Sequence, residues 1–323
     1  METSSLIPES IAIRLIADKP VRKTPYQVKG VFMKEFSEEK IVPFLDGKLR
    51  NKYLYPRVQV KILNEQIYII GIKEGVEPII SIIDNVKSFN FGNITINIDS
   101  YEIEENIDQF KVAEKLFRYK FITPWVALNK STSGEYRFLS NQEKPLYLNK
   151  LLGQNLLFIA KEVGEEIKTK IYTKVITDAN VPEKIDDNGW SSFTGEFKTN
   201  FILPSYIGLG NGITRGYGTL FSLNNPNIFK TQSLEENIDD YLKEEINEED
   251  ELMTFVTIDD APVIKRKKHK KRSNNYKRKR RNNRLSNNKY SNRKKLSKNK
   301  KNNDINDETR FNSEEYHKKQ HDL

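Results

Sequence analysis

The chain has 323 residues, of which 37% are hydrophobic and 31% are charged, and it contains no cysteine. This length allows two domains of ordinary size, and the polar composition indicates that part of the chain stays outside a folded core. The absence of cysteine excludes disulfides, thiolate nucleophiles and Cys-ligated zinc, and it fits a reducing compartment. The N-terminal residues lack the basic and apolar regions of a signal peptide, and no apolar run approaches the roughly 18 residues of a membrane helix. We therefore expect a cytoplasmic protein with no membrane partner.

The N-terminal part, residues 1–115, has the apolar periodicity of a mixed α+β unit. In chain order we predict a strand over 11–16, a helix over 26–36, a hairpin of strands 55–62 and 66–72 around an Asn64-Glu65 turn, a helix over 76–86, and a strand over 94–103. The order β-α-β-β-α-β is that of a ferredoxin-like (RRM-like) domain.

A similar domain is predicted for residues 116–230. Its elements are a strand over 117–128 broken by Pro124, an amphipathic helix over 144–163, and strands over 167–176, 193–203 and 216–223. No helix is visible before the last strand, so this second match is less complete. The predicted fold class is α+β, with two tandem ferredoxin-like domains.

The net charge of +9 is concentrated in the C-terminal part of the chain. Residues 231–264 contain 12 acids and one lysine, whereas residues 265–301 contain 20 Lys/Arg and no acid. We predict an acidic linker (231–264) with a short helix at about 238–246, and a disordered basic tail (265–323) that binds nucleic acid without reading its sequence. Two alternatives are that the acidic segment masks the tail and that the tail only increases solubility.

A cluster of glycines between two predicted strands is the strongest local signal. Five glycines and one arginine lie within eleven residues: Gly208, Gly210, Gly212, Arg215, Gly216 and Gly218. Such a cluster indicates positive φ angles or close approach of the backbone to a ligand, and free amides in the loop would form an anion site. The spacing fits neither a P-loop nor a dinucleotide fingerprint. A phosphate-binding loop and a wide hairpin connection both remain open.

The strand over 55–62 carries a second candidate surface. Arg57, Gln59 and Lys61 share one face of that strand because side chains alternate with a period of two. They could line an RNA groove, or they could form an ordinary solvated face.

Seven segments in a fixed order resemble the CRISPR-associated RAMP endoribonucleases, in their subtype-b branch. They are residues 53–61, 70–75, 119–129, 152–156, 193–197, 203–210 and 214–218, and the resemblance covers about residues 10–223. It implies two tandem ferredoxin-like domains and a glycine-rich loop that lies against the RNA backbone. The implied reaction uses neither metal nor cofactor: the ribose 2′-hydroxyl attacks the adjacent phosphate, leaving a cyclic phosphate and a 5′-hydroxyl.

The chain departs from the family at the segment that usually supplies the acid and base. Where this branch usually reads Phe-His-Asn-His, residues 44–47 read Phe-Leu-Asp-Gly, and the three histidines of the chain lie at positions 269, 317 and 321. In one interpretation Lys48, Lys52 and Tyr53, beside the missing histidines, carry the chemistry. In another, the protein binds repeat RNA without cutting it. A third is an unrelated RNA-binding protein with similar domains, which the lack of RNP-type aromatic stretches disfavours.

The resemblance also implies the partners. Repeat RNA, within precursor CRISPR RNA, is the expected ligand. Other Cas proteins and a second copy of the chain are further candidates.

Overall fold

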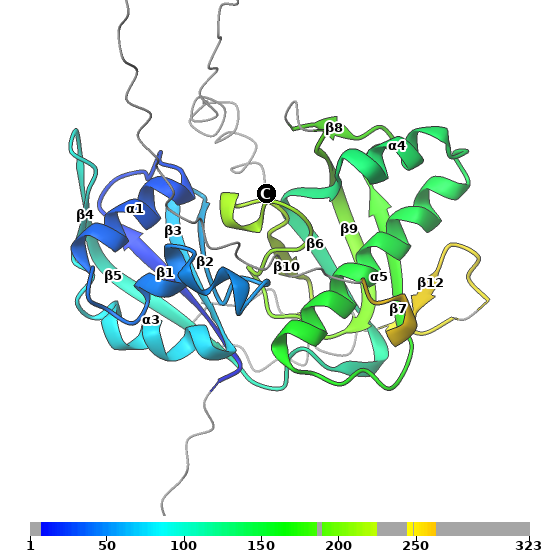
Figure 1. Cartoon of the computed structure of the whole chain (residues 1–323), viewed down its shortest axis with the longest axis horizontal. Coiled ribbons are helices and arrows are strands. Elements are labelled where there is room, and N and C mark those ends of the chain that lie inside the picture. The colour runs from blue at the N-terminus through cyan, green and yellow to red at the C-terminus, as the bar shows by residue number, and fades with distance from the viewer. Residues whose placement is uncertain (1–7, 186–188, 225–243, 248, 263–323) are drawn as a thin grey trace, which may run out of the picture.

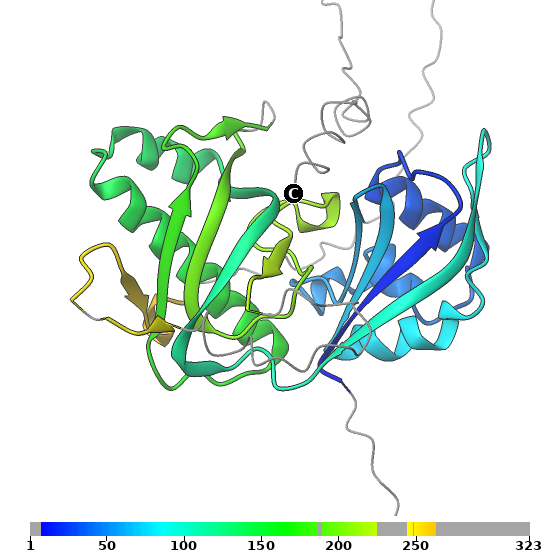
Figure 2. The ribbon, with the colours of Figure 1, turned by 180° about the vertical axis from the view of Figure 1, so that it is seen from behind.

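A computed structural model describes residues 8–185, 189–224, 244–247 and 249–262. It consists of two α+β domains, each with one antiparallel sheet, standing side by side (Figure 1). Figure 2 shows the two sheets from behind, with the helices on their far side. This architecture confirms the predicted fold class.

The N-terminal domain has the predicted β-α-β-β-α-β order. Its main elements are β1 (Ser10–Ala17), α1 (Pro25–Glu35), β2 (Val58–Leu63), β3 (Gln66–Ile72), α3 (Val76–Ile83) and β5 (Thr95–Asn106). Four short elements were not predicted: α2 (Val42–Leu45), η1 (Lys48–Asn51), η2 (Lys73–Gly75) and β4 (Ser88–Asn90). The sheet order β2-β3-β1-β5-β4 is a ferredoxin-like sheet with an added edge strand.

Local sequence accounts for the boundaries of these elements. Thr24 caps the N-terminus of α1 and forms a capping box with Gln27, and Pro25 between them occupies the first turn. Asn64 and Glu65 both have positive φ, 48° and 56°, as a two-residue type I′ hairpin turn requires. The predicted turn between β2 and β3 is therefore confirmed.

Both faces of the N-terminal sheet are covered at β2 and β3, whereas β5 is largely accessible. One face packs under the helices of its own domain, with Ile11, Ile13 and Ile69 in the core. On the other face, Tyr68 and Ile70 join the hydrophobic core of the C-terminal domain. Because β2 and β3 lie between two cores, nearly every residue of these strands is buried.

The C-terminal domain is built around one long strand. Its elements are β6 (Val112–Leu128), α4 (Lys130–Phe138), α5 (Glu143–Val163), β7 (Ile171–Thr177), β8 (Glu183–Lys184), β9 (Ser191–Phe201), η3 (Ile213–Arg215), β10 (Leu220–Ser222), β11 (Glu244–Glu245), β12 (Thr254–Val256) and η4 (Ile258–Asp260). The order β10-β6-β9-β7-β12 places β6 and β9 at the centre of the sheet. None of the described helices combines the length and the apolarity that a membrane span needs.

Two details of this domain differ from the sequence-based predictions. Strand β6 begins at Val112 and continues through Pro124, where its pairing with β9 becomes irregular between Phe121 and Trp125. Pro124 has no N–H to donate, so the ladder loses its regularity there, but the strand does not end. The short helix α4 was not predicted; Asn129 caps its N-terminus.

The acidic segment is partly a component of the C-terminal sheet. β11 pairs with Leu116 and Lys115 of β6, and β12 pairs with β7. The helix predicted at about 238–246 is therefore wrong for Glu244 and Glu245, which are extended because they complete a ladder; residues 238–243 lie outside the described part of the chain. The predicted basic tail, 265–323, also lies outside the described residues.

Candidate nucleic-acid interface

The glycine-rich loop connects β9 to β10 and lies between the two domains (Figure 1). Gly210, Gly212, Gly216 and Gly218 have positive φ, between 63° and 96°. A Cβ at Gly218 would lie 2.0 Å from the Leu209 carbonyl oxygen. Glycine is thus required here by the backbone conformation and by packing of the loop on itself.

Most amides of the loop are already used inside the protein. The Gly208 amide donates to Gln59 Oε1 (2.9 Å), the Asn211 amide to the Val126 carbonyl (3.0 Å), and the Gly218 amide to the Pro124 carbonyl (2.9 Å). The expected row of free amides is therefore wrong for most of the loop. At the start of η3, by contrast, the amides of Ile213 and Thr214 donate to no acceptor within the described residues, as expected for the first turn of a helix.

Two lysines of the N-terminal domain donate hydrogen bonds to carbonyl oxygens of this turn. Lys61 Nζ donates to the Ile213 carbonyl (3.1 Å), and Lys29 Nζ donates to the Thr214 carbonyl (2.9 Å). Burial, together with the charge of Lys29, lowers the pKa of Lys61 to about 7, and burial lowers the pKa of Lys29 to about 8. No aspartate or glutamate of the described chain forms an ion pair with either lysine. Two basic side chains therefore meet at η3, and burial disfavours the charged form of each.

Three more side chains surround the outer surface of η3. The Arg215 guanidinium lies 5.1 Å from the ring centroid of Trp190, a cation–π geometry that fixes its direction. The hydroxyl of the exposed Tyr26 is 3.4 Å from Thr214 Oγ1, and the ring of Tyr26 lies 4.1 Å from Lys29 Nζ. Cationic and aromatic groups thus meet at one accessible turn, a combination that suits a nucleic-acid backbone.

Arg57, Gln59 and Lys61 do share one face of the chain, but that face is not an open groove. All three are buried, at 3%, 1% and 0% exposure. Arg57 forms an ion pair with Glu74 (2.7 Å) and donates to the Glu162 carbonyl, while Gln59 and Lys61 bind the glycine-rich loop. The alternation of β2 indicated the shared face correctly, but the C-terminal domain covers that face.

Lys48, Lys52 and Tyr53 lie near the other end of β2. Lys48 pairs with Asp46 (3.0 Å), and the Tyr53 hydrogen bond raises the pKa of Lys52. The Tyr53 ring lies 4.9 Å from the Arg57 guanidinium carbon. Arg57, which contacts Tyr53, and Lys61, which holds η3, are four residues apart in extended chain, a span of about 13 Å. The described contacts do not join the two groups of candidates directly.

Sequence reasoning missed Lys29, Tyr26 and Trp190. Lys29 comes directly after the apolar Val28 in a predicted helix, and a lysine at such a position is ordinarily solvated. No local pattern distinguishes it from the exposed lysines of the chain. Tyr26 belongs to the first turn of α1, and Trp190 precedes β9. The contact between the domains brings Tyr26 and Lys29 to the glycine-rich loop, whereas Trp190 reaches it within the C-terminal domain.

Two ferredoxin-like domains in tandem, with a glycine-rich loop before β10 of the second, are the architecture of the CRISPR-associated RAMP class. Family models of the Cas6b N-terminal and C-terminal domains match residues 9–109 and 111–223. The chain therefore belongs to the Cas6b family.

Two solved structures match about two thirds of this chain, and one curated relative matches a shorter part. A crystal structure of Cas6b matches with a TM-score of 0.55 and 28% identity, over 66% of this chain and 98% of that chain. A crystal structure of the CRISPR RNA processing endoribonuclease Cas6b matches with a TM-score of 0.50 and 26% identity, over 67% and 98%. An uncharacterized protein of Methanocaldococcus jannaschii is 30% identical over 139 residues, which are 43% of this chain and 95% of that relative.

Proposed function

We propose that this chain is an endoribonuclease that cuts precursor CRISPR RNA within its repeats without a metal ion. The ribose 2′-hydroxyl gives its proton to a base while its oxygen attacks the adjacent phosphorus. The bond between phosphorus and the 5′-oxygen breaks, which leaves a 2′,3′-cyclic phosphate, and the departing 5′-oxygen takes up a proton. Membership of the Cas6b family supports this proposal, as does similarity to a structure described as a CRISPR RNA processing endoribonuclease.

The observation that carries the proposal is the concentration of basic groups at η3. Lys29 and Lys61 bind its carbonyls from below, and Arg215 stacks on Trp190 beside it. The amides of Ile213 and Thr214, at the start of the turn, donate to no acceptor of the described chain. Fixed donors and cations of this kind stabilise the charge that develops on a pentacoordinate phosphorus. In this proposal Gly208, Gly210, Gly212, Gly216 and Gly218 allow the turn to form, and Arg215 contacts the phosphate.

Proton transfer requires groups whose pKa can be matched to the reaction. Lys48, Lys52 and Tyr53 are the candidates from the sequence, and Lys29 is added by the structure. The pKa of Lys29, lowered to about 8, lies near physiological pH, where a group exchanges protons most effectively. Positioning the 2′-hydroxyl in line with the scissile bond contributes independently of these groups.

A specific observation favours a second function, repeat-RNA binding without cleavage. The three histidines of the chain, at positions 269, 317 and 321, all follow the two matched domains, so neither domain contains an imidazole. Acid–base help is worth about 10²–10⁴-fold in rate, so a protein without it could retain binding and lose most turnover.

Incubating the full chain with repeat RNA in EDTA separates the two functions. The endoribonuclease proposal predicts a cyclic phosphate and a 5′-hydroxyl at one site, and no product when that site carries a 2′-deoxy nucleotide. Intact RNA at enzyme concentrations that saturate binding would support the non-catalytic function. Association with other Cas proteins or with a second copy of the chain is a separate proposal, which light scattering of the protein with and without RNA tests.

A further inference from the structure

A pocket of about 300 Å³ lies between the glycine-rich loop and helix α5. Gly210, Asn211 and Ile213 of the loop form one wall, and residues of α5, among them Gln154 and Phe158, form another. The volume is at the lower end of the range for small-ligand sites. None of the described residues that line the pocket is charged, so the pocket suits a neutral ligand better than an isolated anion or cation.

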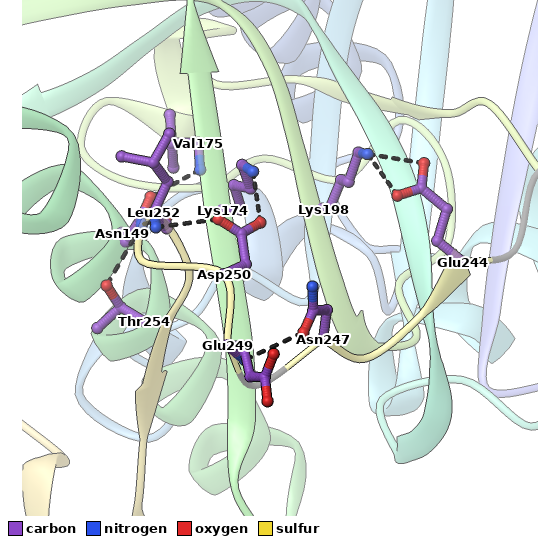
Figure 3. Close-up of polar contacts among 10 residues, drawn as sticks. All are labelled: Asn149, Lys174, Val175, Lys198, Glu244, Asn247, Glu249, Asp250, Leu252 and Thr254. Carbon is purple, nitrogen blue, oxygen red and sulfur yellow. Dashed lines mark hydrogen bonds and ion pairs between the residues drawn. The ribbon is translucent and has the colours of Figure 1, made fainter.

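The C-terminal segment, residues 244–247 and 249–262, helps to fix α5 in place. It follows the two ranges that the Cas6b family models match, and its strand β12 extends the sheet beside β7. The buried Asn149 of α5 donates to the Leu252 carbonyl of this segment (2.8 Å), as Figure 3 shows. The segment also brings Pro262 to the pocket. It therefore completes the pocket as well as the sheet.

The segment and the pocket contact different sides of α5. Val256 of β12 is 1% exposed and rests on Gly153, where a Cβ would lie 2.6 Å from Val256 Cγ1. Asn149 and Gly153 share one side of the helix because they are four positions apart. Gln154 and Phe158, also four positions apart, share another side and line the pocket. Packing on the first side thus holds the pocket side in a fixed position.

Three carboxamides with unused hydrogen-bonding capacity line the pocket. Gln154 is half-buried, and its side chain forms no hydrogen bond within the described part of the chain. Asn155 donates to the Leu151 carbonyl (2.6 Å) and Asn211 to the Val126 carbonyl (3.0 Å). Their Oδ1 atoms accept no hydrogen bond from the described residues. The pocket therefore offers both donors and acceptors to a ligand.

Aromatic side chains lie at the same pocket. Phe158 is half-buried, and the ring of Tyr55 meets it edge-on, with centroids 6.3 Å apart and planes at 83°. Trp125 is fully buried, and its indole nitrogen has no acceptor in the described chain. A Cβ at Gly210 would lie 2.8 Å from that nitrogen, so this donor is next to a residue of the pocket. Rings and neutral hydrogen-bonding groups together suit a flat heterocycle.

The pocket adjoins the turn η3. Ile213 lines the pocket, and its amide and that of Thr214 donate to no acceptor within the described residues. A ligand with a heterocycle in the pocket and an anion at these amides has the chemistry of a nucleotide. Single-stranded RNA is commonly recognised through unstacked bases that lie on aromatic rings and form hydrogen bonds along their edges.

We propose that this pocket binds one unstacked nucleobase of the RNA, on the nucleotide next to the phosphate at η3. Phe158 provides the stacking surface, and the Gln154 carboxamide forms hydrogen bonds with the edge of the base. The inference rests on the proposed RNA substrate. It adds base selection to a loop whose other contacts are with the RNA backbone.

The first experiment scans the RNA with single abasic sites. The full chain binds repeat RNA that carries a 2′-deoxy nucleotide at the cut site, with one base removed at a time on either side of it. Stacking of one base corresponds to about 5–150-fold in affinity, so one abasic site beside the cut site should weaken wild-type binding by this factor. Phe158→Leu keeps apolar volume without a ring, so it should weaken binding of the intact RNA and lose most of that penalty.

Two outcomes of this scan would overturn the proposal. One is a penalty for the abasic site that is equal in the wild type and in Phe158→Leu. The other is the absence of any penalty beside the cut site in the wild type. Thermal unfolding of Phe158→Leu shows whether the variant is folded, and the next experiment does not depend on that variant.

The second experiment replaces the carboxamide that would contact the base. Gln154→Met keeps the length of the side chain and removes both hydrogen-bonding groups, and Gln142→Met is the control at an exposed position just before α5. Affinity is compared for the four natural bases at the position that the scan identifies. A bidentate contact from a carboxamide discriminates by about 5–150-fold, so the wild type and Gln142→Met should share a preference that Gln154→Met loses. The same preference in Gln154→Met, or equal affinity for all four bases in the wild type, would overturn the proposal.

Cleavage of intact repeat RNA by the wild type distinguishes this inference from the proposed function. A wild type that cuts repeat RNA in EDTA, with pocket variants that leave base sensitivity unchanged, would contradict the nucleobase pocket alone. A wild type that binds repeat RNA no better than unrelated RNA would contradict the proposed function, and this inference with it.

Discussion

Lys61→Met gives the sharpest test of how the glycine-rich loop is held. Lys61 is fully buried, and its pKa falls from 10.5 to about 7. Between pH 7 and pH 10.5 the folded state therefore binds fewer protons than the unfolded state. Stability consequently rises with pH through that window, and the contribution of Lys61 is smallest below pH 7. One pKa unit corresponds to about 1.4 kcal/mol, so from pH 6 to pH 9 Lys61 adds about 3 kcal/mol of pH-dependent stability.

Methionine is similar in length and carries no proton. At pH 9 the variant loses the hydrogen bond to the Ile213 carbonyl and should be less stable by about 1–3 kcal/mol. At pH 6 the wild type contains a buried ammonium, which lowers its stability. The difference in unfolding free energy between wild type and variant should therefore shrink to zero or reverse. Urea unfolding at pH 6, 7, 8 and 9 measures this difference, with the exposed Lys150→Met as the control. A stability difference that stays constant from pH 6 to pH 9 would refute the argument.

Three further predictions concern the loop and the reaction. Gly218→Ala forces a Cβ to within 2.0 Å of a carbonyl oxygen at a φ of 63°, so it should lower the unfolding free energy by more than about 2 kcal/mol. Gly134→Ala, with open space inside α4, should raise it by about 0.5–1 kcal/mol; thermal unfolding compares the two, and equal effects would contradict the close packing of the loop. Arg215→Ala should leave the fold intact and reduce the slope of log affinity against log salt by about 0.7 on single-stranded repeat RNA; an unchanged slope would remove Arg215 from the interface. Tyr53→Phe should slow single-turnover cleavage by about 10²-fold or more at unchanged RNA affinity if the tyrosine exchanges a proton, and an unchanged rate would exclude that role.

The sequence predicted most of the N-terminal domain because its signals are local. The alternation of β2 and β3, the Asn64-Glu65 turn and the spacing of α1 each depend on residues a few positions apart. α4 and β11 lack such signals. α4 has a local cap at Asn129 but only one buried residue, Tyr136, and therefore no apolar periodicity, and β11 is extended only because β6 offers it a partner.

The candidate site was only partly predictable. The sequence identified the glycine-rich loop and Arg215, since a glycine cluster with one cation is unusual. It could not show that Lys61 lies under that loop, since a lysine on an alternating strand has the same pattern whether water or another domain covers it. Lys29, 185 positions away from Thr214 in the chain, reaches the same turn only through the packing of the two domains.

Local periodicity and glycine content determined the order of the elements and the position of the glycine-rich loop, because each depends on steric preferences of neighbouring residues. The tertiary structure decided which polar faces are buried, which lysines lose their water, and where the C-terminal segment docks. Those properties depend on the surfaces that meet when the domains pack, and desolvation and pairing are set by residues far apart in the chain.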